Sequence, residues 1–145
     1  MLTPQTVSRR LSHLYRHLAL WVLQSWLAMF YIAAGYAKLT QPQEMLAVLM
    51  VWPADAGQTT VRLIGGVELA LAVGMVSPLL SWRLFLRLML IAGLGLTAEA
   101  TLMAIYHAAS QHPGLALVNA ALALMGGMVI RGRMREAADA GRRAQ

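Results

Sequence analysis

Four long apolar runs constrain the fold of this chain more than any other feature. They lie at about residues 18–37, 61–80, 84–106 and 114–130. A helix of roughly 20 such residues crosses the hydrocarbon core of a bilayer. Only 12% of the residues are charged, against about 25% in a typical soluble domain. The runs therefore predict an all-α membrane protein, folded as a four-transmembrane antiparallel helix bundle.

The length of 145 residues suits one domain with flanking segments. We predict a basic N-terminal segment at residues 1–17, a transmembrane domain at 18–132 and a basic, frayed tail at 133–145. Leucines at helical spacing in the first segment indicate that it extends the first helix or lies along the membrane interface. The first apolar run is longer than a signal-peptide core, so we expect it to be retained as a transmembrane helix.

A short helix is expected in the connection between the first two runs. Residues 42–52 are apolar enough to form it, with Pro42 suited to the first turn and Pro53 ending it. About ten residues are too few to span a bilayer. We therefore predict a short interfacial helix between helices 1 and 2, with Trp52 at the level of the lipid headgroups.

The basic residues predict the orientation. Four spans place both termini and the turn at 81–87 on one side, with ten of the 12 lysines and arginines. The other side holds only Lys38 and Arg62. The positive-inside rule then places both termini in the cytoplasm. Because topology explains the net charge of +6, we expect the lipid bilayer as a partner and no nucleic acid.

Cysteine and metal chemistry are not expected. The chain contains no cysteine, which excludes disulfides and thiolate ligands. Its 4 histidines lack the spacing of a ligand set, apart from His13 and His17 near the predicted cytoplasmic surface. We predict no metal site.

Two acidic residues, Glu68 and Glu99, interrupt the second and third apolar runs. A charged acid near the centre of a transmembrane helix costs roughly 2.5–3.5 kcal/mol on insertion scales, so each needs a partner or a function. Each lies about seven residues from the outer end of its run, or roughly 10 Å at 1.5 Å per residue. We therefore predict that the two carboxyl groups lie at one depth on different helices.

The polar residues of the spans gather in this outer half, whereas the inner half holds little beyond Gln24 and Ser25. The candidates for a buried polar cluster or a ligand site are Lys38, Arg62, Glu68, Glu99, His107 and Asn119. Two interpretations are open for Glu68: a static ion pair with Lys38 or Arg62, or a group that handles a ligand or a proton. No catalytic residue is assigned.

Small residues recur beside these polar positions. Glycines at helical spacing allow helices to approach closely within a membrane. The glycines that we expect at helix–helix contacts are Gly35, Gly65, Gly66, Gly74, Gly95 and Gly127. Their faces suggest that the polar side chains point into the bundle.

Residues 18–132 resemble the DoxX-like family of small four-helix bacterial inner-membrane proteins. The resemblance rests on the Gly-x-x-Lys end of the first run, Gly35 to Lys38, on Trp52-Pro53, and on the stretch 63–78. That stretch contains Gly65, Glu68 and a final Ser77-Pro78. Lys38 and Glu68 correspond to a recurring polar pair of the family. Glu99 is outside that pattern, and the family's basic residue shortly after His107 is missing.

The resemblance implies an accessory or quinone-linked subunit of a membrane redox system in the bacterial inner membrane. Some members are subunits of thiosulfate:quinone oxidoreductase. We see no flavin, haem or iron–sulfur motif, so no intrinsic cofactor is expected: a quinone is the candidate ligand, and a redox partner protein would supply electrons. The alternatives are a small transporter or proton-pathway protein, for which four spans favour a homo-oligomer, and a non-catalytic scaffold or assembly factor. Whether the chain is an enzyme stays open.

Overall fold

The computed structural model describes residues 4–143, apart from the side chains of residues 4–10, 13, 82–85, 140 and 143. Within this part the chain is helical. The elements are α1 (Pro4–Thr40), α2 (Gln43–Met50), the 3-10 turn η1 (Trp52–Ala54), α3 (Gln58–Val76), the 3-10 turn η2 (Ser77–Leu79), α4 (Trp82–Ala109) and α5 (Pro113–Arg143).

Four helices contain stretches long and apolar enough to cross a membrane. The stretches are Leu14–Thr40, Gln58–Leu79, Leu86–Ala109 and Pro113–Asp139. Large apolar side chains such as Val22, Met29, Leu117 and Leu124 are exposed on the outside of the bundle, as is expected of surfaces that face lipid. The predicted fold class, a helical membrane bundle with a short extra helix, is confirmed.

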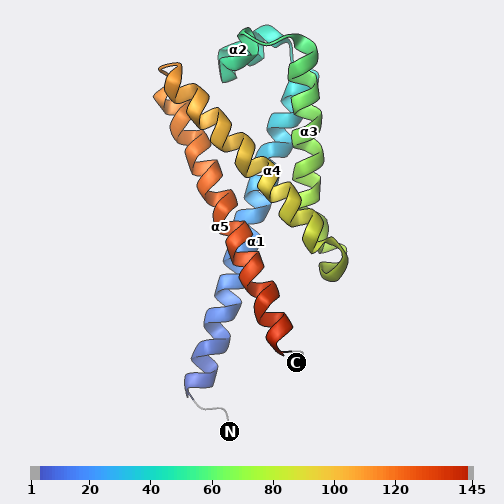
Figure 1. Cartoon of the computed structure of the whole chain (residues 1–145), viewed down its shortest axis with the longest axis vertical. Helices are drawn as coiled ribbons and strands as arrows, with labels where there is room; N and C mark the ends of the chain where they lie inside the picture. Colours follow the sequence, from blue (N-terminus) through green and yellow to red (C-terminus); the bar gives the residue numbers. More distant parts are fainter. Residues whose placement is uncertain (1–3, 144–145) are drawn as a thin grey trace.

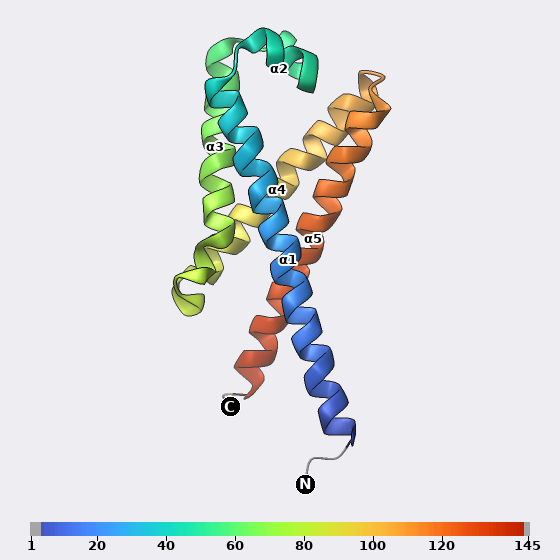
Figure 2. The same ribbon diagram turned by 180° about the vertical axis from the view of Figure 1, so that it is seen from behind.

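The helices form two packed pairs that cross each other. α1 packs along α3, and α4 packs along α5 (Figures 1 and 2). The pairs diverge toward the end where α2 lies, which we call the α2 end, and both termini lie at the opposite end, the terminal end (Figure 1). The buried apolar core, which includes Leu27, Ala72, Met75 and Met89, lies between them.

Close backbone contact between α1 and α3 occurs at two glycines. A Cβ atom on Gly35 would lie 2.7 Å from the carbonyl oxygen of Gly65, and a Cβ atom on Gly65 would lie 2.9 Å from the carbonyl oxygen of Gly35. Only glycine allows this approach, because real Cβ atoms do not come so near to backbone oxygen. The pair brings the C-terminal part of α1 against the first half of α3.

The other predicted packing glycines divide into two groups. A Cβ atom on Gly74 would meet the Cβ of Ala92 at 3.0 Å, and one on Gly95 would meet Leu71. At Gly66 and Gly127 it would meet no atom within 4 Å. Gly66 and Gly127 therefore pack against no described helix of this chain, because sequence spacing cannot show which small-residue stripe faces a neighbouring helix.

The end of α3 shows how backbone groups are satisfied around Ser77-Pro78. Pro78 has no N–H and cannot donate to the carbonyl of Gly74. The hydroxyl of Ser77 donates to that oxygen at 2.7 Å, and the side chain of Gln24 donates to the carbonyl of Met75 at 2.5 Å. The carbonyls that the proline leaves open are thus paired within the protein, as a membrane interior requires.

The structure corrects one prediction about the ends of the chain and, of the two alternatives for the N-terminal segment, confirms that it extends the first helix. The tail is not frayed: α5 runs on to Arg143, because the buried side chains of Arg133 and Glu136 hold its last turns against α1. The N-terminal segment continues α1 as one helix from Pro4. Residues 1–3 and 144–145 of these predicted segments, and the side chains of arginines 9, 10, 83 and 143, lie outside the described residues.

Trp52 is buried within the bundle. The predicted short helix ends at Met50, and Trp52 begins the turn η1, where it is buried against Leu46 and Val61. Val51 between them has φ 65°, a left-handed conformation that β-branched residues rarely adopt. This reversal turns the indole back into the bundle.

Candidate functional site

A buried ion pair joins α1 to α3 near the α2 end. The ammonium group of Lys38 donates to both carboxylate oxygens of Glu68, with Nζ 2.6 Å from Oε2. Lys38 is 4% exposed and Glu68 is 2% exposed. Of the two cations considered for Glu68 from the sequence, the structure pairs it with Lys38. Burying one charge alone would cost several kcal/mol, so the two residues must be considered together.

Glu99 on α4 adds a second carboxyl group to this pair. Its electrostatic neighbours are Glu68, with which it shares a hydrogen bond, and Lys38. The two acids that the sequence places at one depth therefore meet in space. One lysine faces two carboxyl groups, so the cluster is electrically neutral when the two carboxyl groups share one proton.

His107 lies eight residues after Glu99 on α4, or about two helical turns closer to the α2 end. The residue is 2% exposed, and its Nδ1 atom is buried with no hydrogen-bond partner among the described residues. Its ring packs edge-on against Tyr106 and against His112. A buried polar nitrogen without a partner is costly, and the residue that carries it lines a cavity.

The cavity lies between the two helix pairs and under α2, with a volume of about 210 Å³. Its polar lining comes from the ion pair, Glu99, His107 and Asn119. The apolar lining comes from α1, α2, α4, α5 and η1. It consists of Phe30, Tyr31, Ala34, Leu49, Met50, Trp52, Met103, Leu115, Val118 and Leu122. The cavity is thus aromatic and apolar, with a few polar groups gathered on its walls, as in many small-molecule sites.

Asn119 contributes to the cavity from α5. Its Nδ2 atom donates to the carbonyl of Leu115 at 2.9 Å, one turn earlier on the same helix. This bond orients the side-chain amide along the helix. Asn119 therefore brings a polar group to the α5 wall, opposite the ion pair on α1 and α3.

The α2 segment is held over the cavity by side-chain hydrogen bonds. Gln43 at the start of α2 donates to the carbonyls of Pro53 and Ala56 at 2.8 and 2.7 Å. Tyr106 on α4 donates to Asp55 at 2.9 Å. The indole of Trp52 lies beneath, with its ring centroid 5.9 Å from Nζ of Lys38. These contacts make α2 and η1 a fixed cap on the cavity.

Arg62, the remaining predicted site residue, lies outside the cavity. Its guanidinium donates to the carbonyl of Lys38 at 2.7 Å and to that of Gln41 at 3.0 Å. It thus satisfies carbonyl groups at the C-terminal end of α1, where a cation is also favoured by the helix dipole. The structure brings the other five candidates together and assigns Arg62 to the end of the helix that carries Lys38.

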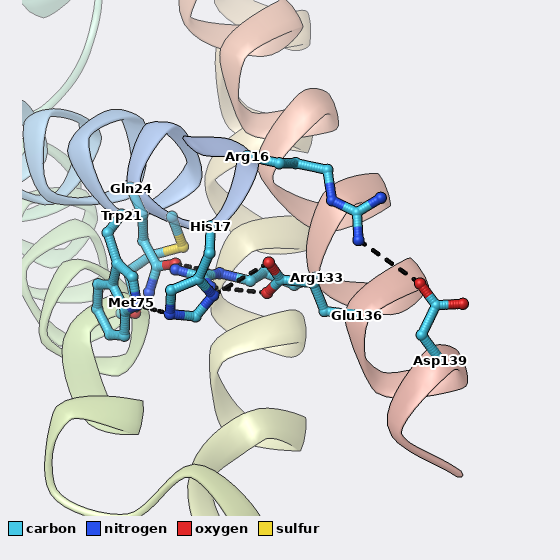
Figure 3. A network of polar contacts seen from close by, with 8 residues as sticks. All are labelled: Arg16, His17, Trp21, Gln24, Met75, Arg133, Glu136 and Asp139. Carbon is cyan, nitrogen blue, oxygen red and sulfur yellow. Dashed lines mark hydrogen bonds and ion pairs between the residues drawn. The ribbon is translucent and has the colours of Figure 1, made fainter. Parts of the chain in front are cut away.

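A second polar cluster, which the sequence reading missed, lies at the terminal end (Figure 3). Arg133 on α5 is 0% exposed. Its Nε donates to Gln24 on α1 at 2.9 Å, and Nη1 donates to Glu136 at 2.9 Å. Its guanidinium carbon lies 4.5 Å from the ring centroid of Trp21. The expectation that the inner half is nearly free of polar groups is therefore wrong.

The cluster extends along α1 through His17. The indole of Trp21 donates to Nε2 of His17 at 3.0 Å, and Nδ1 of His17 lies 3.1 Å from Glu136. Because Nε2 accepts this hydrogen bond, we assign the ring proton to Nδ1, which donates to the carboxylate. At its edge, Arg16 pairs with Asp139 at 3.5 Å (Figure 3).

Spacing in the sequence could have revealed this cluster. Positions 17, 21 and 24 fall on one face of a helix, and Arg133 precedes Glu136 by three residues. The arginines of the tail indicate topology, and the spacing of Arg133 and Glu136 also indicates a pair within the helix. Among the described residues, no group of three or more histidine, cysteine, aspartate or glutamate side chains could hold a metal ion.

Comparison with known proteins gives one match. The family model for the DoxX-like family matches residues 22–129, which span all four apolar helices and both residues of the buried ion pair. The chain matches no curated protein and no solved structure.

Proposed function

Because this chain belongs to the DoxX-like family, and is thus a multi-pass membrane protein with a polar cavity among its helices, we propose that it binds a quinone in that cavity. It would do so as an accessory subunit of a membrane redox system. The observation that carries the proposal is buried His107, which lines a cavity with aromatic walls and a two-carboxyl cluster, and whose Nδ1 has no hydrogen-bond partner among the described residues.

The lining suits the head group of a quinone. Trp52, Phe30 and Tyr31 offer aromatic surfaces to a flat ring, and His107 and Asn119 offer hydrogen-bonding groups to its carbonyl oxygens. The isoprenoid tail would leave between the helix pairs into the lipid. A charged substrate fits less well, because the lysine charge is already neutralised by Glu68.

The protein's part in the reaction would be proton exchange. Reduction of a quinone to a quinol takes up two electrons and two protons. A redox partner protein would donate the electrons. Glu99 and His107 would pass protons to the two ring oxygens and recover them from water, in a general acid role. Glu68 would keep Lys38 in place beside the head group throughout.

The same proposal includes the orientation and the compartment. We place both termini in the cytoplasm of a bacterium and the cavity in the outer half of the inner membrane. The described arginines support this: arginines 16, 87, 131, 133, 135 and 142 all lie toward the terminal end. Lys38 and Arg62 lie toward the α2 end, and both are engaged in contacts within the fold.

Quinone binding can be tested on the purified protein in detergent. We expect a short-chain ubiquinone or menaquinone to bind and to quench the fluorescence of Trp52. Glu99→Gln and His107→Gln should each weaken binding by about tenfold, because a hydrogen bond to a ligand in a buried site contributes about 1.5 kcal/mol. Folding is checked by helical circular dichroism and by a single elution peak.

Matched controls are available in the chain. Glu44→Gln removes a carboxylate from the exposed side of α2, and His17→Gln removes an imidazole that does not line the cavity. Both variants should bind quinone as the wild type does. Absence of quinone binding by the folded wild type would refute the proposal, and so would equal losses in the cavity variants and the controls.

Orientation can be tested with introduced thiols, because the chain has no cysteine of its own. Gln111→Cys places one at the α2 end and Ser81→Cys places one at the terminal end. In spheroplasts, whose inner membrane is sealed, a membrane-impermeant maleimide should label the Gln111→Cys variant and not the Ser81→Cys variant. Labelling of the Ser81→Cys variant alone would show that the orientation is the reverse of the one proposed.

The second cluster gives some support to a proton-pathway protein instead. Polar groups now lie at both ends of the bundle, in the cavity and around Arg133. Between them lies an apolar layer that includes Leu27, Ala72 and Met89, so a continuous path is interrupted. Proton flux into proteoliposomes, measured with an internal pH dye, distinguishes the two functions. Flux through the wild type that is lost in Glu99→Gln would favour a proton pathway over quinone binding.

A further inference from the structure

An open groove runs between α4 and α5 near the terminal end, well away from the cavity under α2. Its volume is about 490 Å³. α4 and α5 pack together from the loop that joins them and diverge toward the terminal end (Figures 1 and 2). The groove is lined by Leu94, Thr97, Gly127, Ile130, Arg131, Met134, Arg135 and Ala138.

The upper part of the groove is apolar and is kept open by a glycine. Leu94 on α4 and Ile130 on α5 form its sides. A Cβ atom on Gly127 would meet no atom within 4 Å, so the missing side chain leaves space that faces the bilayer. An extended acyl chain can lie in such a channel, parallel to the helices.

The lower part carries two arginines on the same face of α5. Arg131 and Arg135 are four residues apart, so their side chains lie one above the other. Both are exposed, and neither has an ion pair among the described residues. In contrast, the neighbouring Arg133 pairs with Glu136, and Arg142 pairs with Asp139. Two positive charges are thus left for a partner outside the chain.

The position of these two arginines along α5 suits the headgroup of a bound lipid. The uncharged part of α5 ends at Ile130, and Arg131 follows directly. The guanidinium groups therefore lie where the hydrocarbon region gives way to the headgroups, while the apolar part of the groove lies within the hydrocarbon. A ligand that fills the whole groove must be apolar at one end and negatively charged at the other.

We propose that this groove binds an anionic phospholipid, with an acyl chain between α4 and α5 and the phosphate between Arg131 and Arg135. The arginines select charge, because a guanidinium binds phosphate by paired, charge-assisted hydrogen bonds. Basic pockets between transmembrane helices are established sites for anionic headgroups. The groove selects for a lipid over a soluble anion, because only a lipid covers its apolar walls.

Native mass spectrometry of the protein in detergent tests the site. The probes are phosphatidylglycerol and phosphatidylcholine with identical acyl chains, and glycerol 3-phosphate as the free headgroup. We expect one phosphatidylglycerol to be retained per chain, with an affinity about tenfold above that for phosphatidylcholine. The double variant Arg131→Gln, Arg135→Gln should remove this preference. Gly127→Leu, which fills the groove, should reduce the retention of both lipids.

Matched controls separate the site from general effects. The double variant Arg87→Gln, Arg142→Gln removes two exposed arginines from the same end of the bundle without touching the groove. Gly66→Leu places the same side chain on another open glycine, on α3. Both controls should keep the wild-type lipid preference. If Gly127→Leu fails to fold, the two arginine variants still decide.

Four results would overturn the proposal. They are equal retention of the two lipids by the wild type, equal losses in the groove variants and the controls, and binding of glycerol 3-phosphate with the same dependence on the arginines. The fourth is a dimer that Gly127→Leu abolishes while lipid retention is unchanged, which would make a second copy of the chain the occupant. None of these outcomes depends on quinone binding, since the cavity at the α2 end is untouched.

Discussion

Gly65 on α3 lies directly against the stem of Lys38 on α1: a Cβ atom on Gly65 would come within 2.7 Å of the Cβ of Lys38. The relationship is reciprocal, because a Cβ atom on Gly35 would lie 3.4 Å from the Cβ of Glu68. Each glycine thus makes room for one member of the buried ion pair. The lysine and the glutamate can meet only because the two backbones touch.

This contact predicts that Gly35→Ala and Gly65→Ala destabilise the protein. The added methyl group must push α1 away from α3, which should cost about 1–3 kcal/mol of unfolding free energy. Reversible unfolding in mixed dodecylmaltoside and sodium dodecyl sulfate micelles measures it. Gly66→Ala is the control: its methyl group meets nothing, so helix propensity should make it neutral or stabilising by up to about 1 kcal/mol.

Replacing Lys38 and replacing Glu68 should reduce the free energy of unfolding by unequal amounts. Glu68→Gln leaves Lys38 close to a second carboxyl group, that of Glu99, whereas Lys38→Met leaves both acids without a cation. We expect Lys38→Met to cost about 3–5 kcal/mol and Glu68→Gln to cost clearly less, in the same unfolding assay. Equal losses would show that Glu99 does not compensate.

The double variant Lys38→Met, Glu68→Gln completes a cycle with the single variants. Because the single changes leave unpaired buried groups, the double variant should lose less stability than their sum, by about 1–3 kcal/mol. A purely additive result would mean that the two side chains do not interact energetically. The comparison also separates loss of fold from loss of quinone binding.

Arg133 is expected to be essential for stability despite its position in a basic tail. Arg133→Met removes the partner of Gln24 and Glu136 and leaves the buried carboxylate without its guanidinium. We expect a loss of about 3 kcal/mol or more. Arg142→Gln breaks an exposed pair on the same helix, and should cause no measurable change. Similar effects of both variants on unfolding would contradict the assigned role.

Shortening the tail should reveal how far the folded part of α5 extends. A chain that stops after Gly132 loses Arg133 and Glu136, and we expect it to unfold at lower denaturant or to fail to accumulate in the membrane. A chain that stops after Ala140 keeps both residues and Asp139, so its stability should match that of the full chain. Equal stability of the two truncated chains would show that Arg133 and Glu136 do not stabilise the fold.

The sequence alone determined the number of spans, their antiparallel order and the side on which each polar residue lies. Composition decides these properties, because a run of about 20 apolar residues must cross the bilayer whatever its neighbours are. It also predicted that Glu68 and Glu99 lie at one depth on different helices, since depth follows from counting residues. Five of the six site candidates therefore gather around one cavity.

Only the tertiary structure decided which faces of the helices meet. A helix that is apolar all round carries little information about its inward face, so Gly65 and Gly66 could not be told apart, although one touches α1 and the other touches nothing described. The spacing of Arg133 and Glu136 indicates their pairing, but only the packing of α5 against α1 buries Arg133 (Figure 3). Hydropathy determines depth in the membrane, whereas helix rotation and long-range pairing depend on packing.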